Sequence, residues 1–437
     1  MIGPGKSHWL YAGGILVLGA VLLASCIPQP KVNENKVHLV FTTFLEEEVF
    51  NSQIKQPVEA KYPEIELNYN WESAMIITLG LDNSESLGDI RHVKVRSGPA
   101  DVDYIPEAKL PNAFTAEDLR PYVENSQLDT SRIDRKIWNH AESIQTHGEL
   151  AVLPYSKKLF ALYYNKQVFD KYGVDYPRDG MTWNDVLALA RQLPPGVKLD
   201  PSSMGWINLA YQLGIDWEDL SSNHQETREK WMEIISLYEK LASLPGYKYW
   251  EVWHSDNEFL DGFKQNEVAM SISPYWYFSS RIDSKIRSLP LQRAIQAGID
   301  MDVVTFPFFA DHPDQQPARM EEALQMYASS THKEEAFQVM AYLLSDEHQL
   351  SISKLGVGPV LENPDIKQAF ASAIPEVQDR NLMAFFPPSH IGNLNKGHLL
   401  ESRKVLNMIN TIDMVFQEIL KHKLDAETAI EQIMSNY

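Results

Sequence analysis

The stretch "SPYWYFSS" (273–280) places four aromatic side chains in a row behind a proline. Aromatic rings pack in hydrophobic cores, but they also form platforms on which flat ligands stack. At helical spacing Phe278 shares a face with the isoleucines four and eight residues later, so we expect it to pack in the core. Trp276 lies about 200° around such a helix from Phe278, beside small serines. Trp276 therefore does not share the core face of Phe278, and the roles of the two tyrosines stay open.

The sequence lacks the motifs of common hydrolase sites. It contains no G-x-S-x-G and no H-E-x-x-H, and its 13 histidines are scattered. A glycoside hydrolase would need two carboxylates facing each other across a cleft, but acidic residues are too numerous here to indicate such a pair. The segment "GPGKS" (3–7) imitates the end of a phosphate-binding loop but lacks the strand and glycine that precede one. We expect no catalytic site, no metal and no cofactor.

Length, composition and charge favour a globular protein of two lobes that does not bind nucleic acid. A chain of 437 residues is too long for one simple core, which favours two lobes. Its 44% hydrophobic and 22% charged residues are ordinary for a soluble globular protein. The formal net charge of −20, with no compact basic run, argues against nucleic acid as a partner.

The single cysteine, Cys26, follows a targeting segment. Residues 1–25 carry Lys6, then the apolar run "WLYAGGILVLGAVLLAS", and end in small residues directly before Cys26. The tetrad "LASC" (23–26) resembles the bacterial lipoprotein signal, in which the cysteine becomes the lipidated first residue. The alternative is a membrane-spanning anchor, for which a run of about 17 residues is at the lower limit. Both interpretations place the bulk of the protein outside the cytoplasmic membrane, and we favour lipidation at Cys26.

Hydrophobic periodicity predicts alternating strands and helices. Residues 37–44 form a β-branched strand, 45–62 a helix with an acidic first turn, and 64–71 an alternating strand, which together make a β–α–β unit. Further strands are expected at 100–105 and in 148–165, where the chain breaks around 154–158. Thr182 and Asp185 predict a capping box at the start of a helix over 181–193. Other helices are expected over 228–244, as a pair within 332–356, and over 403–423. Such alternation implies an α/β fold.

Three segments, in this order, resemble the extracellular solute-binding proteins of ABC importers, the group that includes maltose-binding protein. The first, 148–193, matches at Gly148, Pro154, Tyr155, Tyr163, Tyr164, Asn165, Lys166, Phe169, Gly173, Pro177, Thr182 and Trp183. The second, "FKQNEVAMSISPYWYF" (263–278), departs from the pattern at Asn266, where glycine is usual. Asparagine adopts a left-handed turn more readily than most residues, so the turn can survive. The third segment is 331–360, and weaker likeness covers nearly the whole chain from residue 37.

This resemblance implies two discontinuous α/β lobes, joined by a hinge, with a ligand cleft between them. Chain crossings are expected near 155–159, near Ser284 and near Tyr327. The predicted organisation is a signal peptide at 1–25, a tether at 26–36, one lobe at 37–155 plus 285–326, and the other at 156–284 plus 327–437.

The resemblance also implies individual ligand contacts. By register from Ala269 and Met270, Trp276 matches the cleft tryptophan of the maltose-binding group. Glu46 falls where the group keeps an acidic ligand residue, although it is equally explained as a solvated glutamate of a helical first turn. Phe44 has the same two interpretations, contact with a ligand or packing.

Lys158 departs from the group, which often has a carboxylate at this hinge break. An ammonium in the cleft would favour an acidic ligand such as a uronate-bearing sugar. The calcium-loop interpretation of "DVDYIPE" (101–107) fails, because the glycine turn and regular oxygen spacing are missing. Glu107 is the better cleft candidate in that segment.

The remaining candidates are aromatic or polar residues in two later segments. They are Trp206, Asn208 and Tyr211 in "SSMGWINLAYQL" (202–213), and Phe386 and His390 in "MAFFPPSH" (383–390). Packing inside the protein is the alternative for the three residues of the first segment. The second segment lies in a region that bears a stacking ring in the group.

We therefore expect a lipid-anchored extracellular receptor, not an enzyme, that captures a sugar and delivers it to the permease of an ABC importer. A secreted carbohydrate-active enzyme is one alternative. A surface sensor or adhesion lipoprotein that keeps the same fold is another, and the sequence does not separate it from a transport receptor.

Overall fold

The computed structural model describes residues 36–71, 88–94, 116–143, 149–200, 205–215, 224–245, 247, 263–272, 289–318, 320–387 and 402–435. By its contacts the chain divides into residues 1–36 and 37–437. Apart from Lys36, all the described residues belong to the second of these units.

The first sheet begins with the predicted β–α–β unit. β1 (Val37–Thr43) pairs in parallel with β2 (Ile65–Trp71) and with β3 (Ile90–Lys94). β9 (Met320–Met326) then pairs antiparallel with both β3 and β4 (Leu153–Lys157). The described order is β2-β1-β3-β9-β4, so a strand from late in the chain completes a sheet that starts at residue 37.

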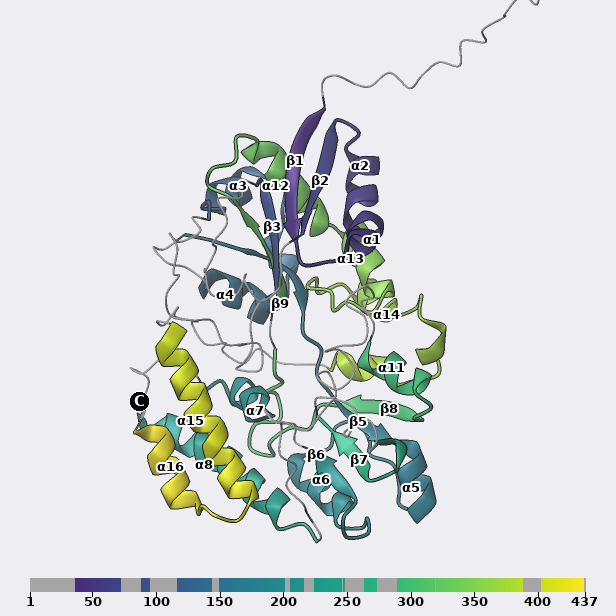
Figure 1. Ribbon diagram of the computed structural model, residues 1–437, viewed down its shortest axis with the longest axis vertical. Helices are drawn as coiled ribbons and strands as arrows, with labels where there is room; N and C mark the ends of the chain where they lie inside the picture. Colours follow the sequence, from purple (N-terminus) through teal and green to yellow (C-terminus); the bar gives the residue numbers. More distant parts are fainter. Residues whose placement is uncertain are drawn as a thin grey trace, which may run out of the picture. The chain divides into compact units, whose positions relative to one another are not determined.

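Helices cover this first sheet. The predicted helix over 45–62 forms as α1 (Glu47–Phe50), a π-helical segment (Asn51–Lys55) and α2 (Gln56–Lys61), and it lies along β2 in Figure 1. The predicted pair within 332–356 forms as α12 (Lys333–Leu343) and α13 (Asp346–Lys354). Before β4, the described residues also form α3 (Arg120–Asn125), a 3-10 turn (Thr130–Arg132) and α4 (Arg135–Ser143). One hydrophobic cluster joins residues of β1, β4, β9, α4 and α12.

The second sheet has the described order β6-β7-β5-β8 and is buried on both faces. Its strands are β5 (Ala161–Asn165), β6 (Lys198–Asp200), β7 (Val268–Ser271) and β8 (Met301–Thr305). All five residues of β5 are buried. Leu162 and Tyr164 join one hydrophobic cluster, whereas Ala161 and Tyr163 join another. Successive strand residues point to opposite faces, so this sheet is covered on both sides.

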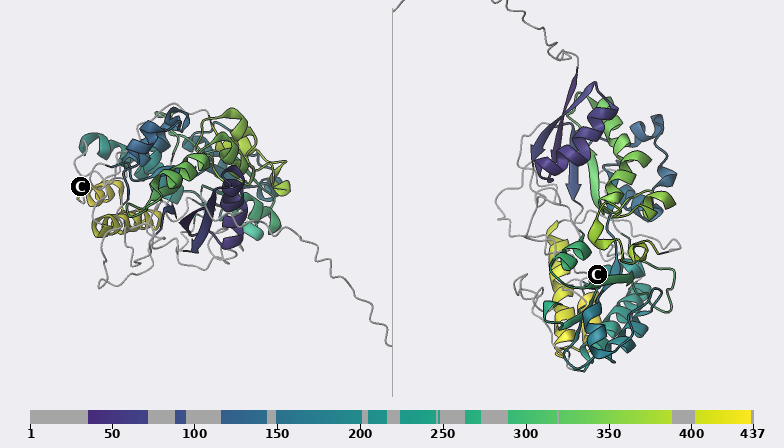
Figure 2. Two further views of the ribbon diagram at one scale, coloured as in Figure 1. Left: turned by 90° about the horizontal axis from the view of Figure 1, so that it is seen from above. Right: turned by 90° about the vertical axis from the view of Figure 1, so that its right-hand side faces the viewer.

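Several local predictions for the second sheet and its helices are confirmed. Thr182 caps α6, and Thr182 and Asp185 form the expected capping box. Asn266 has a φ of 59°, which confirms the left-handed turn predicted for it. The predicted terminal helix forms as α15, which packs against α8 and lies beside α16 in both Figure 1 and Figure 2. The bounds are α5 (Lys166–Tyr172), α6 (Trp183–Ala190), α7 (Gly205–Leu213), α8 (His224–Ala242), α11 (Pro290–Gln296), α14 (Pro364–Gln368), 3-10 turns at Pro375–Val377 and Leu382–Phe385, α15 (Ser402–Leu420) and α16 (Ala426–Met434).

The strand pairing corrects several predicted boundaries. The expected break at 154–158 is wrong, because residues up to Lys157 belong to β4 and the interruption before β5 is at 158–160. The assignment of 285–326 to the first lobe is wrong for β8, which pairs with β5 in the second sheet. The assignment of all of 327–437 to the second lobe is wrong for α12, whose apolar side chains join the first-sheet cluster. The expected strand at 100–105 and the crossing near Ser284 lie outside the described residues.

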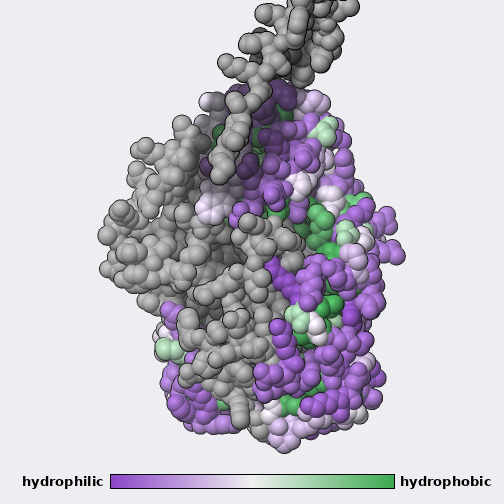
Figure 3. Space-filling view, turned by 45° about the vertical axis from the view of Figure 1, so that its right-hand side comes forward, coloured by the Kyte–Doolittle hydropathy of each residue, from purple (hydrophilic) through white to green (hydrophobic). Residues whose placement is uncertain are grey.

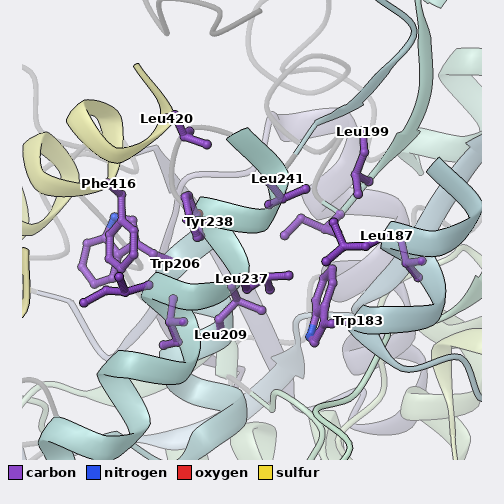
Figure 4. Close-up of a cluster of buried hydrophobic side chains, with 14 of the residues drawn as sticks. Trp183, Leu187, Leu199, Trp206, Leu209, Leu237, Tyr238, Leu241, Phe416 and Leu420 are labelled. Carbon is purple, nitrogen blue, oxygen red and sulfur yellow. The ribbon is translucent and has the colours of Figure 1, made fainter. Parts of the chain in front are cut away.

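Trp206 lies in the core that α7 forms with α8 and α15. Its ring is fully buried and stacks on Phe416, with 6.1 Å between ring centroids. Figure 4 shows Trp206 and Phe416 together with Tyr238 of α8. The indole Nε1 donates a hydrogen bond of 3.3 Å to Asp413. Burial raises the pKa of Asp413 to about 6, although hydrogen bonds from Gln417 and Trp206 partly oppose this rise.

The raised pKa of Asp413 makes the stability of this core depend on pH. The folded-state pKa of about 6 exceeds the usual 3.8, so the folded protein holds this proton more tightly than the unfolded chain. The resulting stabilisation is complete below about pH 4 and is lost as the pH rises through 6. We expect Asp413→Asn to raise the free energy of unfolding at pH 8 by roughly 2 kcal/mol and to change it little at pH 4. Urea unfolding of both proteins at these two pH values measures the difference. An equal effect at both pH values would contradict the assignment.

Candidate functional site

The carboxyl ends of the parallel strands of the first sheet bring candidate residues together. In open α/β sheets, ligands bind outside the carboxyl ends of the strands. β1 ends at Thr43 and is followed by a loop, Phe44–Glu46, that leads into α1. This loop, here called the β1 loop, contains the predicted contacts Phe44 and Glu46, and both side chains are half-buried.

Hydrogen bonds at Leu45 hold the β1 loop. Its backbone N–H donates to Thr43 Oγ1 over 3.1 Å, and its carbonyl oxygen accepts from the Tyr69 hydroxyl over 2.8 Å. Burial raises the pKa of Tyr69, and the carboxylates of Glu46 and Glu47 raise it further. The negative charge of Glu46 therefore acts on the same small region as the two hydrogen bonds.

A buried group of polar side chains lies behind the β1 loop. His92 on β3 has its Nδ1 3.2 Å from Thr43 Oγ1 and its Nε2 3.4 Å from Glu322 Oε2 on β9. The Ser156 hydroxyl on β4 donates to the same Glu322 oxygen over 3.0 Å. The Phe44 ring lies over His92, with 5.0 Å between ring centroids. We call His92, Glu322, Ser156 and Thr43 the edge network. The sequence analysis missed it, because its members come from four strands whose pairing is not visible in a local pattern.

Trp71 is a second feature that the sequence analysis missed. It is the last residue of β2 and pairs in register with Thr43, immediately before the β1 loop. Its side chain is 55% exposed, whereas the other tryptophans in the described part of the chain are buried. The signal that could have revealed it is its place at the end of a strand that follows a β–α unit.

The predicted contact Lys158 follows directly after β4. Its Nζ lies 5.7 Å from the centroid of the Phe160 ring, and the side chain is half-buried. The neighbouring Lys157 forms ion pairs with Asp134 at 2.8 Å and with Glu362 at 3.1 Å. Burial alone would lower the pKa of Lys157, but these two carboxylates hold it above its usual value. At this junction, Lys157 is therefore the lysine that forms ion pairs with two carboxylates.

The candidates on α7 lie in or against the core of the second sheet. Trp206 is fully buried and Asn208 is 5% exposed, whereas Tyr211 is half-buried and packs on the same hydrophobic cluster. Their burial favours the packing alternative. Phe386 is half-buried too, and its ring packs against Phe370 with 5.3 Å between centroids. Ligand contact by these four residues stays a prediction.

Four further candidates lie outside the described residues. They are Trp276, Glu107, His390 and the lipidation site Cys26. Within the described part, no cluster of His, Cys, Asp and Glu side chains could hold a metal ion. None of the helices described here is both long and apolar enough to cross a membrane. On the face drawn in Figure 3, the described surface is mostly hydrophilic, with smaller hydrophobic areas between.

The mixed α/β fold is shared by solved structures of binding proteins. The chain has a TM-score of 0.64 and 15% identity to a sugar transporter from Rhizobium etli in an open conformation, covering 92% of this chain and 98% of that one. A cyclic alpha-maltosyl-1,6-maltose binding protein from Arthrobacter globiformis gives 0.64 and 13%, with 92% and 98% covered. A probable secreted solute-binding lipoprotein from Streptomyces coelicolor gives 0.61 and 14%, again with 92% and 98% covered. The TM-scores at these low sequence identities show a common fold, of the periplasmic-binding-protein type.

The family follows from the sequence itself. The profile described as "Bacterial extracellular solute-binding protein" matches residues 47–350. The chain belongs to this family, whose members are extracellular receptors and not enzymes. The alternative of a secreted enzyme is thereby set aside. No curated protein matches the chain.

Proposed function

We propose that this protein is a lipid-anchored receptor that binds a sugar or oligosaccharide and delivers it to the permease of an ABC importer. Membership of the extracellular solute-binding family carries the proposal. The sugar class is supported by two structures of the same fold, the sugar transporter from Rhizobium etli and the maltosyl-maltose binding protein from Arthrobacter globiformis. The anchor rests on the signal-like segment that ends at Cys26.

The edge of the first sheet has the chemistry that a sugar requires. A sugar ring presents an apolar face and many hydroxyls, so its site combines aromatic rings with polar side chains. Phe44 and Trp71 offer rings at the ends of β1 and β2, and Glu46 offers a carboxylate between β1 and α1. On the second lobe, we propose Trp276 as the principal stacking ring. Lys158 supplies an ammonium for a carboxylate-bearing sugar.

A thermal-shift panel tests the binding proposal. We expect at least one mono- or oligosaccharide to raise the melting temperature by roughly 5 °C at about 100 times its Kd, because a ligand that binds only the folded state stabilises it. The panel compares neutral oligosaccharides with uronate-bearing ones of equal length, alongside peptides and polyols. A shift by neutral sugars alone would reject the proposed role of Lys158. No shift by any sugar would reject the sugar proposal.

Two aromatic substitutions test where the sugar binds. We expect Trp276→Ala and Trp71→Ala each to weaken the affinity for the sugar with the largest shift at least about tenfold, because each removes an apolar surface that the sugar covers. Tyr172→Ala, at a 36% exposed position on α5 away from the strand ends, is the control and should bind as the wild type does. Titration calorimetry measures the three affinities. Unchanged binding by Trp276→Ala would refute its assignment as the stacking ring.

Substitution of Cys26 tests the anchor. Expressed in a bacterium that processes lipoproteins, the wild type should partition with membranes and carry a lipid-sized mass increase at Cys26. Cys26→Ala should lose the mass increase, because no thiol remains to accept the lipid. Fractionation and mass spectrometry of the N-terminal peptide read the outcome. A wild-type chain that keeps residues 1–25, with an unmodified thiol, would show instead that the apolar run is a membrane-spanning anchor.

A further inference from the structure

The edge network connects the β1 loop to strands that come much later in the chain. Thr43 Oγ1 receives the Leu45 N–H at 3.1 Å and faces His92 Nδ1 at 3.2 Å. On the other side of the imidazole, Nε2 faces Glu322 on β9, and Glu322 accepts from Ser156 on β4. A continuous line of polar contacts therefore runs from the loop through β3 to β9 and β4.

We propose that His92 is a positioning residue for the β1 loop, and that Glu322 and Ser156 make the position of this loop depend on β9 and β4. The inference deepens the proposed function and rests on it, because the loop carries the proposed sugar contacts Phe44 and Glu46. His92 itself touches no sugar in this proposal. It acts through Thr43, whose hydroxyl holds the Leu45 amide, and through its ring contact with Phe44.

The His92–Glu322 contact is buried and is therefore stronger than an exposed contact between the same groups. Their side chains are 0% and 7% exposed. Two other His–Glu contacts in the described residues, His38–Glu66 and His312–Glu233, are far more exposed. Water screens an exposed pair but does not reach a buried one, so a buried polar group that loses its partner is not rescued by solvent. The buried pair therefore constrains geometry in a way that the exposed pairs do not.

The role of each atom at Thr43 depends on the tautomer of His92. Nε2 faces the Glu322 carboxylate at 3.4 Å in a close electrostatic contact that lacks the geometry of a hydrogen bond. In the tautomer with its proton on Nε2, Nδ1 is an acceptor, and the Thr43 hydroxyl donates to it while the Thr43 oxygen accepts the Leu45 N–H. The rings of Phe44 and Tyr155 lie 5.0 and 4.7 Å from His92 between centroids, and limit its rotation. The two hydrogen-bond contacts at Thr43 and the two rings beside His92 together restrict the position of the loop.

His92→Phe separates hydrogen bonding from packing. Phenylalanine keeps a ring beside Phe44 and Tyr155 but removes both nitrogens. We expect the Leu45 amide of the sugar-free protein to exchange with deuterium at least tenfold faster in His92→Phe than in the wild type. His312→Phe is the matched control, because it removes a His–Glu contact of 3.1 Å elsewhere in the chain, and it should leave this amide unchanged. His92→Asn, whose amide can still reach Thr43, should restore most of the protection.

A titration with maltotriose links the loop to binding. We expect His92→Phe to weaken this affinity about tenfold, and His92→Asn and His312→Phe to stay within about twofold of the wild type. Equal exchange at Leu45 in His92→Phe and wild type would overturn the positioning role. Faster exchange with unchanged maltotriose affinity would overturn its link to the binding site.

The two proposals fail differently. If no sugar binds the wild type, the proposed function fails, whereas exchange at Leu45 still decides whether His92 positions the loop. Circular dichroism shows whether His92→Phe folds. If it does not, Glu322→Gln replaces it, because glutamine preserves the shape and can still accept from Ser156. That variant should speed Leu45 exchange about threefold, and an unchanged rate would overturn the proposal.

Discussion

The insertion of β9 between β3 and β4 is the constraint on which the first sheet depends. β9 pairs antiparallel with both strands, and its register places Leu324 opposite His92 and Glu322 opposite Ser156. Without it, β3 and β4 would each leave a row of backbone groups unpaired. Bringing β9 back to this sheet costs loop-closure entropy, because all four described strands of the second sheet lie between β4 and β9 along the chain. The same pairing that completes the sheet assembles the edge network.

A second consequence of this chain path concerns the junction beside β4. Lys157 ends the strand, and its ammonium lies between the carboxylates of Asp134 and Glu362. The backbone N–H of Lys157 also donates to the Gly358 carbonyl oxygen. A Cβ on Gly358 would lie 2.1 Å from the Lys157 carbonyl oxygen. Only glycine fits so close an approach. The segment after α13 is therefore held against β4 by both charge and backbone contact, at the place where the chain leaves the first sheet for β5.

Local patterns predicted the elements of this fold but not their partners. The strands at β1 and β2, the Thr182–Asp185 capping box and the turn at Asn266 were all predicted, because each depends on residues within a few positions. The places of β8 and α12 were not, since strand pairing and helix packing join distant segments. The exposure of a polar or aromatic side chain also depends on distant segments that pack against it. Trp206 and Asn208 are buried, whereas Trp71, which the sequence analysis missed, is exposed at the end of β2.

The edge network shows why such a site is hard to recognise from sequence. A buried histidine and glutamate cost desolvation energy, and well-packed apolar residues in their place are often neutral or stabilising. The polar residues of the edge network instead restrict the relative orientation of the groups that they join. Apolar contacts tolerate small sliding movements, whereas hydrogen bonds weaken steeply when their angles change. In the function proposed above, the β1 loop holds Phe44 and Glu46 against a sugar, and such binding groups have to be kept close to one geometry. Stability alone would not require His92 at this position, whereas the proposed positioning of the β1 loop would.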